Sequence, residues 1–275
     1  MKRTLFLFLV AAAVLASSCN KPLANVAEPD EIVFGIEGDG IDIDVLTKAA
    51  AVTSVASVYW QCLEGGSNVY GPLLCTVTTG TAYTTKYWPA AGATYDYRVS
   101  NVSFTSAGVI AATNATDIIA GTASSVTNNS CTVTLDHIFA RTGSLTLNTQ
   151  AGYEVSGITW RIKAKGSGVV GTAGNYTIGT GWAASGNTGL TSFQEFTGSS
   201  DLYLIPGTYQ IELSYTLTKN EYTQSFTKHS EVTLQAGKIN NIAATAVGGA
   251  ASELTFTVSI TGWAEENLPA LILTD

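Results

Sequence analysis

Charged residues are scarce in this 275-residue sequence, and histidine occurs only twice. Asp, Glu, Lys and Arg make up 12% of the chain, and the formal net charge is −8. Because the 13 basic residues are scattered, no basic face is available, and we expect no nucleic-acid partner. His137 and Asp136 fall on opposite faces of a predicted strand, and His229 lies in a polar stretch. No GxSxG motif supplies a nucleophile, so the sequence offers no Ser-His-Asp arrangement. We therefore predict that the protein is not an enzyme and has no catalytic residues.

The usual patterns of metal and cofactor sites are also lacking. None of the four cysteines follows CxxC or Cys/His metal spacing. Residues 37–44 contain four carboxylates, but Asp42 and Asp44 lie on an alternating segment and not in a calcium-binding loop. No predicted helix follows the Gly-Thr-Gly stretch at 179–181, so it offers no phosphate-binding helix N-terminus. We expect neither a metal nor a cofactor.

The pairing of the cysteines stays open on the sequence alone. Cys62 and Cys75 flank a turn at Gly65-Gly66, and outside the cytoplasm they could form a disulfide across a hairpin. That pairing would leave Cys131 free. In the alternative, all three are buried free thiols.

The one long apolar run, residues 5–15, follows two basic residues at the start of the chain. A basic start and a short apolar stretch are typical of a secretory signal, too short to span a bilayer permanently. Small residues then lead to Cys19, as in bacterial lipoprotein signals, although Ala16 stands where leucine is usual. We predict that residues 1–18 are removed and that acylation of Cys19 anchors the protein in the membrane. The alternative is an ordinary signal peptide cut near Ser18.

The rest of the chain predicts β-structure. Residues 19–30 contain two prolines and are interpreted as a tether. Beyond them, apolar and polar residues alternate with a period of two in several segments, for example at 158–165 and 209–217. Polar outer faces on alternating strands are typical of antiparallel sheets packed in pairs. We predict an all-β fold of two β-sandwiches that meet near residues 128–143, with residues 166–200 as a long loop or hairpin insertion.

Most of the aromatic side chains placed on strands fall on apolar faces, where core packing is expected. Trp160, Tyr209 and Tyr215 belong to this group. Trp182 is different, because it lies within the Gly-rich stretch at 166–200. It is the candidate exposed platform on which a sugar ring could stack.

Several phrases of the sequence match one family. They are residues 87–89 (YWP), 95–97 (YDY), 112–117 (ATNATD), 137–141 (HIFAR), 201–209 (DLYLIPGTY) and 236–242 (AGKINNI). With these phrases in order along most of 31–262, the chain resembles fimbrillins, the lipoprotein precursors of type V pili in Gram-negative gut and oral anaerobes. The resemblance implies two tandem transthyretin-like antiparallel β-sandwich domains, at residues 31–138 and 139–275. It also implies an outer-membrane location and a place in a cell-surface fimbria that serves adhesion.

The resemblance further implies assembly by strand exchange. A protease removes an N-terminal segment, and a strand from a neighbouring subunit fills the groove that opens. In this chain the removed strands would be residues 32–36 and 41–45, and the donor strand would be the tail at 264–275. The partners would be other fimbrial subunits, in a homo- or heteropolymer, and the outer membrane through the lipid.

The cleavage site departs from the family pattern, in which the cut generally follows arginine. The first arginine after the signal is Arg98, inside a predicted strand, so we expect cleavage between Lys48 and Ala49. The alternative is that the segment stays attached, as would suit an anchor, tip or accessory subunit. A second hypothesis is a non-polymerising surface lipoprotein or adhesin that binds a glycan or a host protein.

Overall fold

The alternating segments form β-strands, and in the computed structural model no helix occurs among the described residues. The structure describes residues 31–37, 56–78, 81–87, 90, 92–127, 130–198, 202–246 and 254–262. The all-β prediction is confirmed, and the strands in chain order are β1 (Glu31–Glu37), β2 (Ser57–Glu64), β3 (Ser67–Thr78), β4 (Thr81–Tyr87), β5 (Tyr95–Ser100), β6 (Val109–Thr113), β7 (Ile119–Val126), β8 (Ser130–Thr134), β9 (Asp136–His137), β10 (Ala140–Thr149), β11 (Glu154–Ala164), β12 (Ala173–Thr177), β13 (Gly181–Trp182), β14 (Gln194–Phe196), β15 (Tyr203–Leu204), β16 (Gly207–Lys219), β17 (Tyr222–Leu234), β18 (Lys238–Ala246) and β19 (Leu254–Gly262).

The first half of the chain forms one eight-stranded sheet in the order β8-β1-β4-β3-β2-β5-β7-β9. The sheet curls around a single core, because buried residues of β2 and β5, such as Trp60 and Tyr97, share a cluster with Ala82 of β4 and Val133 of β8. β8 therefore lies close to β7, although the two are far apart in the strand order. A Cβ at Gly121 of β7 would overlap the carbonyl oxygen of Thr134.

The second half forms two four-stranded sheets, β15-β10-β18-β19 and β14-β11-β16-β17. Along β16 the burial alternates as the sequence predicts, with Tyr209, Ile211 and Leu213 buried and the residues between them partly exposed. These side chains share one core with Ile242 and Ala244 of β18 in the other sheet. The two sheets therefore face each other as a sandwich.

The stretch at 166–200 does not lie apart from the sheets as a simple loop. It contains the hairpin β12–β13, and β12 pairs in antiparallel fashion with β6 of the first half, from Ala173↔Thr113 to Thr177↔Val109. Under this three-stranded sheet lies a third cluster, which includes Phe104 and Ile110 from one half and Phe139 and Ile205 from the other. The insertion is thus the element that joins the two halves.

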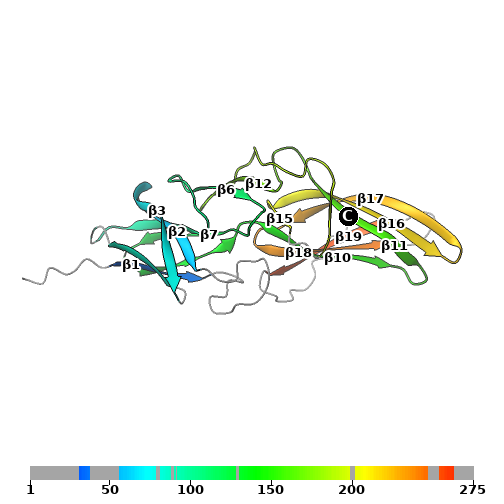
Figure 1. The fold of residues 1–275 in the computed structure, drawn as a ribbon, viewed down its shortest axis with the longest axis horizontal. Helices are drawn as coiled ribbons and strands as arrows, with labels where there is room; N and C mark the ends of the chain where they lie inside the picture. Colours follow the sequence, from blue (N-terminus) through cyan, green and yellow to red (C-terminus); the bar gives the residue numbers. More distant parts are fainter. Residues whose placement is uncertain are drawn as a thin grey trace, which may run out of the picture.

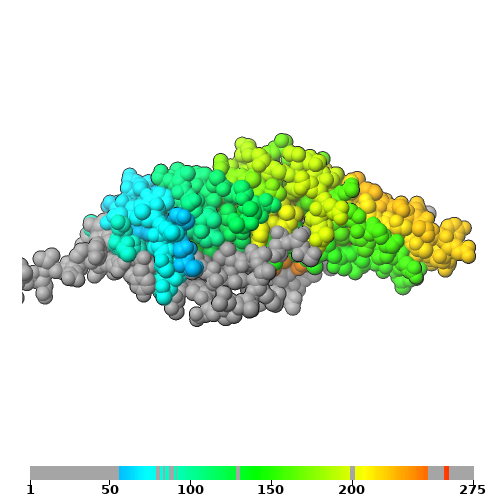
Figure 2. Space-filling model, in the orientation of Figure 1, coloured from blue at the N-terminus to red at the C-terminus, as the bar shows by residue number. Residues whose placement is uncertain are grey.

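The three packed regions follow one another along the long axis of the molecule (Figure 1). The space-filling view shows the same elongated body, with the insertion on its upper surface near the middle (Figure 2). Among the described strands, the eight-stranded sheet ends at His137 and the second sandwich begins at Ala140. Division into transthyretin-like domains at 138/139 stays a prediction.

Candidate functional site

β1 lies inside the first sheet, between β4 and β8. Its pairing with β4 is antiparallel and includes Phe34↔Ala82 and Gly35↔Thr81. Its pairing with β8 is parallel and runs from Val33↔Ser130 to Glu37↔Thr134. In the ladders of the described residues, β8 pairs with β1 alone. Loss of β1 would therefore leave two strand edges with unpaired N–H and C=O groups facing each other.

The strands on both sides of β1 contribute to the core of the first half. Ala82 of β4 and Val133 of β8 are fully buried, and Thr84 of β4 is nearly so. Side chains alternate between the two faces of a strand, so the buried residues of β4 and β8 mark the faces of these two strands that pack on the core. A strand placed between β4 and β8 would therefore complete both a hydrogen-bond ladder and a hydrophobic layer.

The three cysteines of the described residues are free thiols in the structure, so no disulfide joins Cys62 and Cys75 there. Cys62 and Cys75 are buried, whereas Cys131 is only half-buried. Burial raises the pKa of each thiol from its ordinary 9.0 to about 11. The thiols are therefore protonated and weakly nucleophilic near neutral pH. Cys131 lies on β8 directly opposite Phe34 of β1.

The structure corrects the prediction that Trp182 is an exposed platform. The residue is half-buried, and its indole Nε1 donates a hydrogen bond to the carbonyl oxygen of Ile138 at 2.9 Å. Its ring lies 4.9 Å from that of Phe139 and 5.4 Å from that of Tyr176, measured between centroids. Trp182 therefore attaches the β12–β13 hairpin to the junction between the two halves.

The two histidines lie in different surroundings. As predicted, Asp136 is exposed and His137 is buried on the opposite face. His137 contacts Asp117, a partner that no sequence pattern predicted. Nδ1 of His137 and Oδ2 of Asp117 are 2.8 Å apart, and both side chains are 1% exposed. The only signal for Asp117 was its place at the end of the matched phrase at 112–117. His229 is exposed, with Nε2 3.0 Å from Oε2 of Glu212.

Several predicted features lie outside the described residues. They are Cys19, Lys48, Ala49, the segment 41–45 and the tail 264–275. Within the described part of the chain, no group of three or more His, Cys, Asp or Glu side chains gathers as metal ligands would. No helix in that part is long and apolar enough to cross a membrane.

Comparisons with known proteins agree with this architecture. A family model described as fimbrillin-like matches residues 38–263. A Parabacteroides distasonis protein, provisionally described as a cell adhesion protein, has a TM-score of 0.55 and 11% identity over 87% of this chain and 98% of that chain. A Bacteroides eggerthii protein of the same provisional description has a TM-score of 0.51 and 14% identity, with 87% and 98% covered. At this identity the similar structures show the fold alone. No curated protein matches the chain.

Proposed function

This chain belongs to the fimbrillin-like family, and on that premise we propose that it is a structural or accessory subunit of a cell-surface fimbria. The observation that carries the proposal is the position of β1, which lies between two strands that have no ladder of their own with each other. Such a strand can be exchanged for a strand of the same length from another subunit. The protein acts through this sheet position and has no catalytic role.

The assembly sequence begins with export as an outer-membrane lipoprotein acylated at Cys19. Cleavage between Lys48 and Ala49 then separates residues 19–48, which contain β1, from the folded remainder. The tail at 264–275 of a neighbouring subunit enters between β4 and β8. In this tail, Leu268, Ala270 and Ile272 alternate with Pro269, Leu271 and Leu273, which suits a strand buried on both faces.

Strand exchange is favourable only if the incoming strand replaces the backbone hydrogen bonds that β1 made with β4 and β8. Each backbone hydrogen bond of the ladder contributes about 1 kcal/mol net, whereas a buried group left unpaired costs about 1–3 kcal/mol. The open groove is therefore a high-energy state that a donor strand relieves. This is the physical basis of β-augmentation.

Deletion of residues 264–275 tests the proposal. The truncated chain should fold but form no polymer, seen as loss of the detergent-resistant ladder on gels of surface extracts. A Lys48→Gln variant should keep residues 19–48 attached and also prevent polymerisation, while Lys219→Gln, at the tip of the β16–β17 hairpin, should polymerise normally. Persistence of the ladder after the deletion would rule out the tail as donor.

The alternative is a non-polymerising surface lipoprotein that keeps its N-terminal segment and binds a glycan or a host protein. The lysine in place of the family's usual arginine at residue 48 favours this alternative. N-terminal sequencing and intact mass separate the two. Chains that begin at Ala49 support the fimbrial subunit, and intact acylated monomers that carry Cys19 support the surface lipoprotein.

A further inference from the structure

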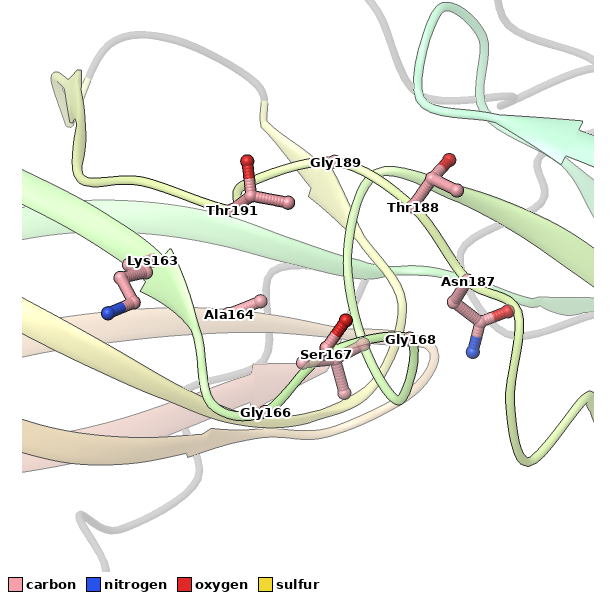
Figure 3. A pocket seen from close by; sticks show the side chains of 10 residues that line it. Lys163, Ala164, Gly166, Ser167, Gly168, Asn187, Thr188, Gly189 and Thr191 are labelled. Carbon is pink, nitrogen blue, oxygen red and sulfur yellow. The ribbon is translucent and has the colours of Figure 1, made fainter.

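A cavity of about 520 Å³ lies where β11 meets two glycine-rich loops, at residues 165–172 and 186–191. Figure 3 shows Lys163 and Thr191 on one side, Asn187 and Thr188 on the other, and Ser167 on the loop below. The volume is within the range of about 300–1,000 Å³ that small-molecule sites occupy. The lining residues are Lys163, Ala164, Gly166, Ser167, Gly168, Val170, Asn187, Thr188, Gly189 and Thr191.

The cavity is preformed, because the two loops are tied to each other. Asn187 is buried, and its Nδ2 donates hydrogen bonds to the carbonyl oxygens of Val169, at 2.7 Å, and Ala183, at 3.0 Å. Its backbone N–H donates to the carbonyl oxygen of Gly168. At Gly189 φ is +96°, and a Cβ there would overlap Oγ1 of Thr172. The positive φ and this overlap both favour glycine at the bend.

One positive charge at the rim is not compensated. β11 carries Arg161, which is exposed, and Lys163, which is half-buried, and the exposed Lys165 follows directly after the end of the strand at Ala164. Arg161 pairs with Glu212, with Nη1 3.1 Å from Oε1, and Lys165 pairs with Glu231. No carboxylate of the described residues pairs with Lys163, although the whole chain is acidic. The middle cation is thus available to an anionic ligand.

The other side chains at the rim of the cavity suit a ligand that carries several hydroxyl groups. Ser167, Thr188 and Thr191 are exposed and present hydroxyl groups, each of which both donates and accepts hydrogen bonds. Phe193 is half-buried, and its ring centroid lies 5.5 Å from Nζ of Lys163. A cation and an aromatic face are therefore held next to the hydroxyl-lined cavity.

We propose that this cavity binds a carboxylated sugar residue, the chemical class of uronic and sialic acids. The ammonium of Lys163 pairs with the sugar carboxylate, and the hydroxyls of Ser167, Thr188 and Thr191 bond the ring hydroxyls. An acidic peptide fits less well, because the lining offers three hydroxyls but only Ala164 and Val170 as apolar contacts for a side chain. The proposal does not depend on polymerisation, so each of the two can fail without the other.

Titration calorimetry on the full chain tests the proposal. The acidic probes are methyl β-glucuronide and the methyl glycoside of N-acetylneuraminic acid. Methyl β-glucoside is the uncharged control, and tetraglutamate represents an acidic peptide. We expect millimolar binding of at least one acidic sugar, with the two acidic probes deciding between uronic and sialic acid, and binding at least about tenfold weaker for the neutral glucoside.

Substitutions locate the binding. Lys163→Gln should weaken acidic-sugar binding about tenfold, whereas Lys219→Gln, the same charge change at the distant hairpin tip, should leave it unchanged. The double variant Ser167→Ala/Thr188→Ala should also weaken it, with circular dichroism showing that each variant is folded. The proposal is overturned if no sugar binds up to about 20 mM, if Lys163→Gln binds as the wild type does, or if tetraglutamate binds more tightly than either acidic sugar.

Discussion

At the scale of single residues, a few buried polar groups position the junction between the two halves. Asp117 and His137 are almost completely buried and contact each other, and the indole of Trp182 reaches the carbonyl oxygen of Ile138. Buried polar groups of this kind are costly when their partner is removed. These residues therefore act as structural attachments at the junction.

Replacement of Asp117 by alanine should lower the free energy of unfolding by about 3 kcal/mol, because it leaves the buried His137 ring without this partner. Urea denaturation followed by tryptophan fluorescence measures the change. The matched control is Arg161→Ala, which breaks a more exposed ion pair with Glu212 and should cost less than about 1 kcal/mol. Equal effects of the two substitutions would contradict a structural role for the buried pair.

The buried thiols predict a loss of stability at alkaline pH. Their folded-state pKa of about 11 lies above the ordinary 9.0, because burial disfavours the thiolate. The unfolded chain therefore loses these protons first, so stability is complete below pH 9 and falls as the pH rises from 9 to 11. Burial also raises the pKa of Tyr97, in the same direction.

Urea midpoints at pH 8 and pH 11 measure this effect. The triple variant Cys62→Ala/Cys75→Ala/Cys131→Ala should lose less stability than the wild type over the same interval, with Tyr97 accounting for part of what is left. A wild-type midpoint that does not change between the two pH values would show that the thiols are not buried as described.

At the scale of elements, period-two alternation predicted β16 well, because one face of this strand is buried along most of its length. In β11 it predicted the burial of Trp160 and Ile162 but not the 44% exposure of Ile158, which lies at a register shift in the pairing with β16. It did not predict the pairing of β12 with β6 or the parallel pairing of β10 with β18. Those partners are distant in the sequence, so no local pattern encodes them. Trp182 was interpreted as exposed for the same reason. Its neighbours in sequence are Gly-rich, whereas its packing partner Phe139 lies far away in the sequence, between β9 and β10.

Trp182→Ala should lower the free energy of unfolding by about 3 kcal/mol, because a packed indole is removed from the junction. Trp182→Phe keeps a ring but loses the hydrogen bond to Ile138, and should cost only about 1 kcal/mol. Tyr222→Ala serves as the control, since Tyr222 is 85% exposed and its loss should change stability by less than about 0.5 kcal/mol. A Trp182→Ala protein as stable as that control would restore the platform interpretation.

Cys131 offers a direct report on β1. In a variant with Cys62→Ala, Cys75→Ala and Cys19→Ser, Cys131 is the only thiol, and it lies opposite Phe34 of β1. Deletion of residues 31–37 should open the groove beside it and raise the rate of maleimide labelling at least about tenfold, because labelling requires an accessible thiolate. An unchanged rate would mean that the groove does not open when β1 is absent.

At the scale of the whole molecule, the chain is an elongated body (Figure 1). β1 lies in the first half, and the cavity next to Lys163 lies in the second half. The three-stranded sheet and the shared core under it connect these halves. In the proposed assembly, the first half joins neighbouring subunits while the second half presents a surface. The sequence predicted the family and the all-β fold. It did not predict how the two halves are connected, which only the structure shows.

Cryo-electron microscopy of the assembled fimbria tests the central claim most directly. We predict that, in each subunit, the position of β1 between β4 and β8 is filled by residues 264–275 of its neighbour. The account is contradicted if residues 31–37 of the subunit itself still occupy that position in the polymer.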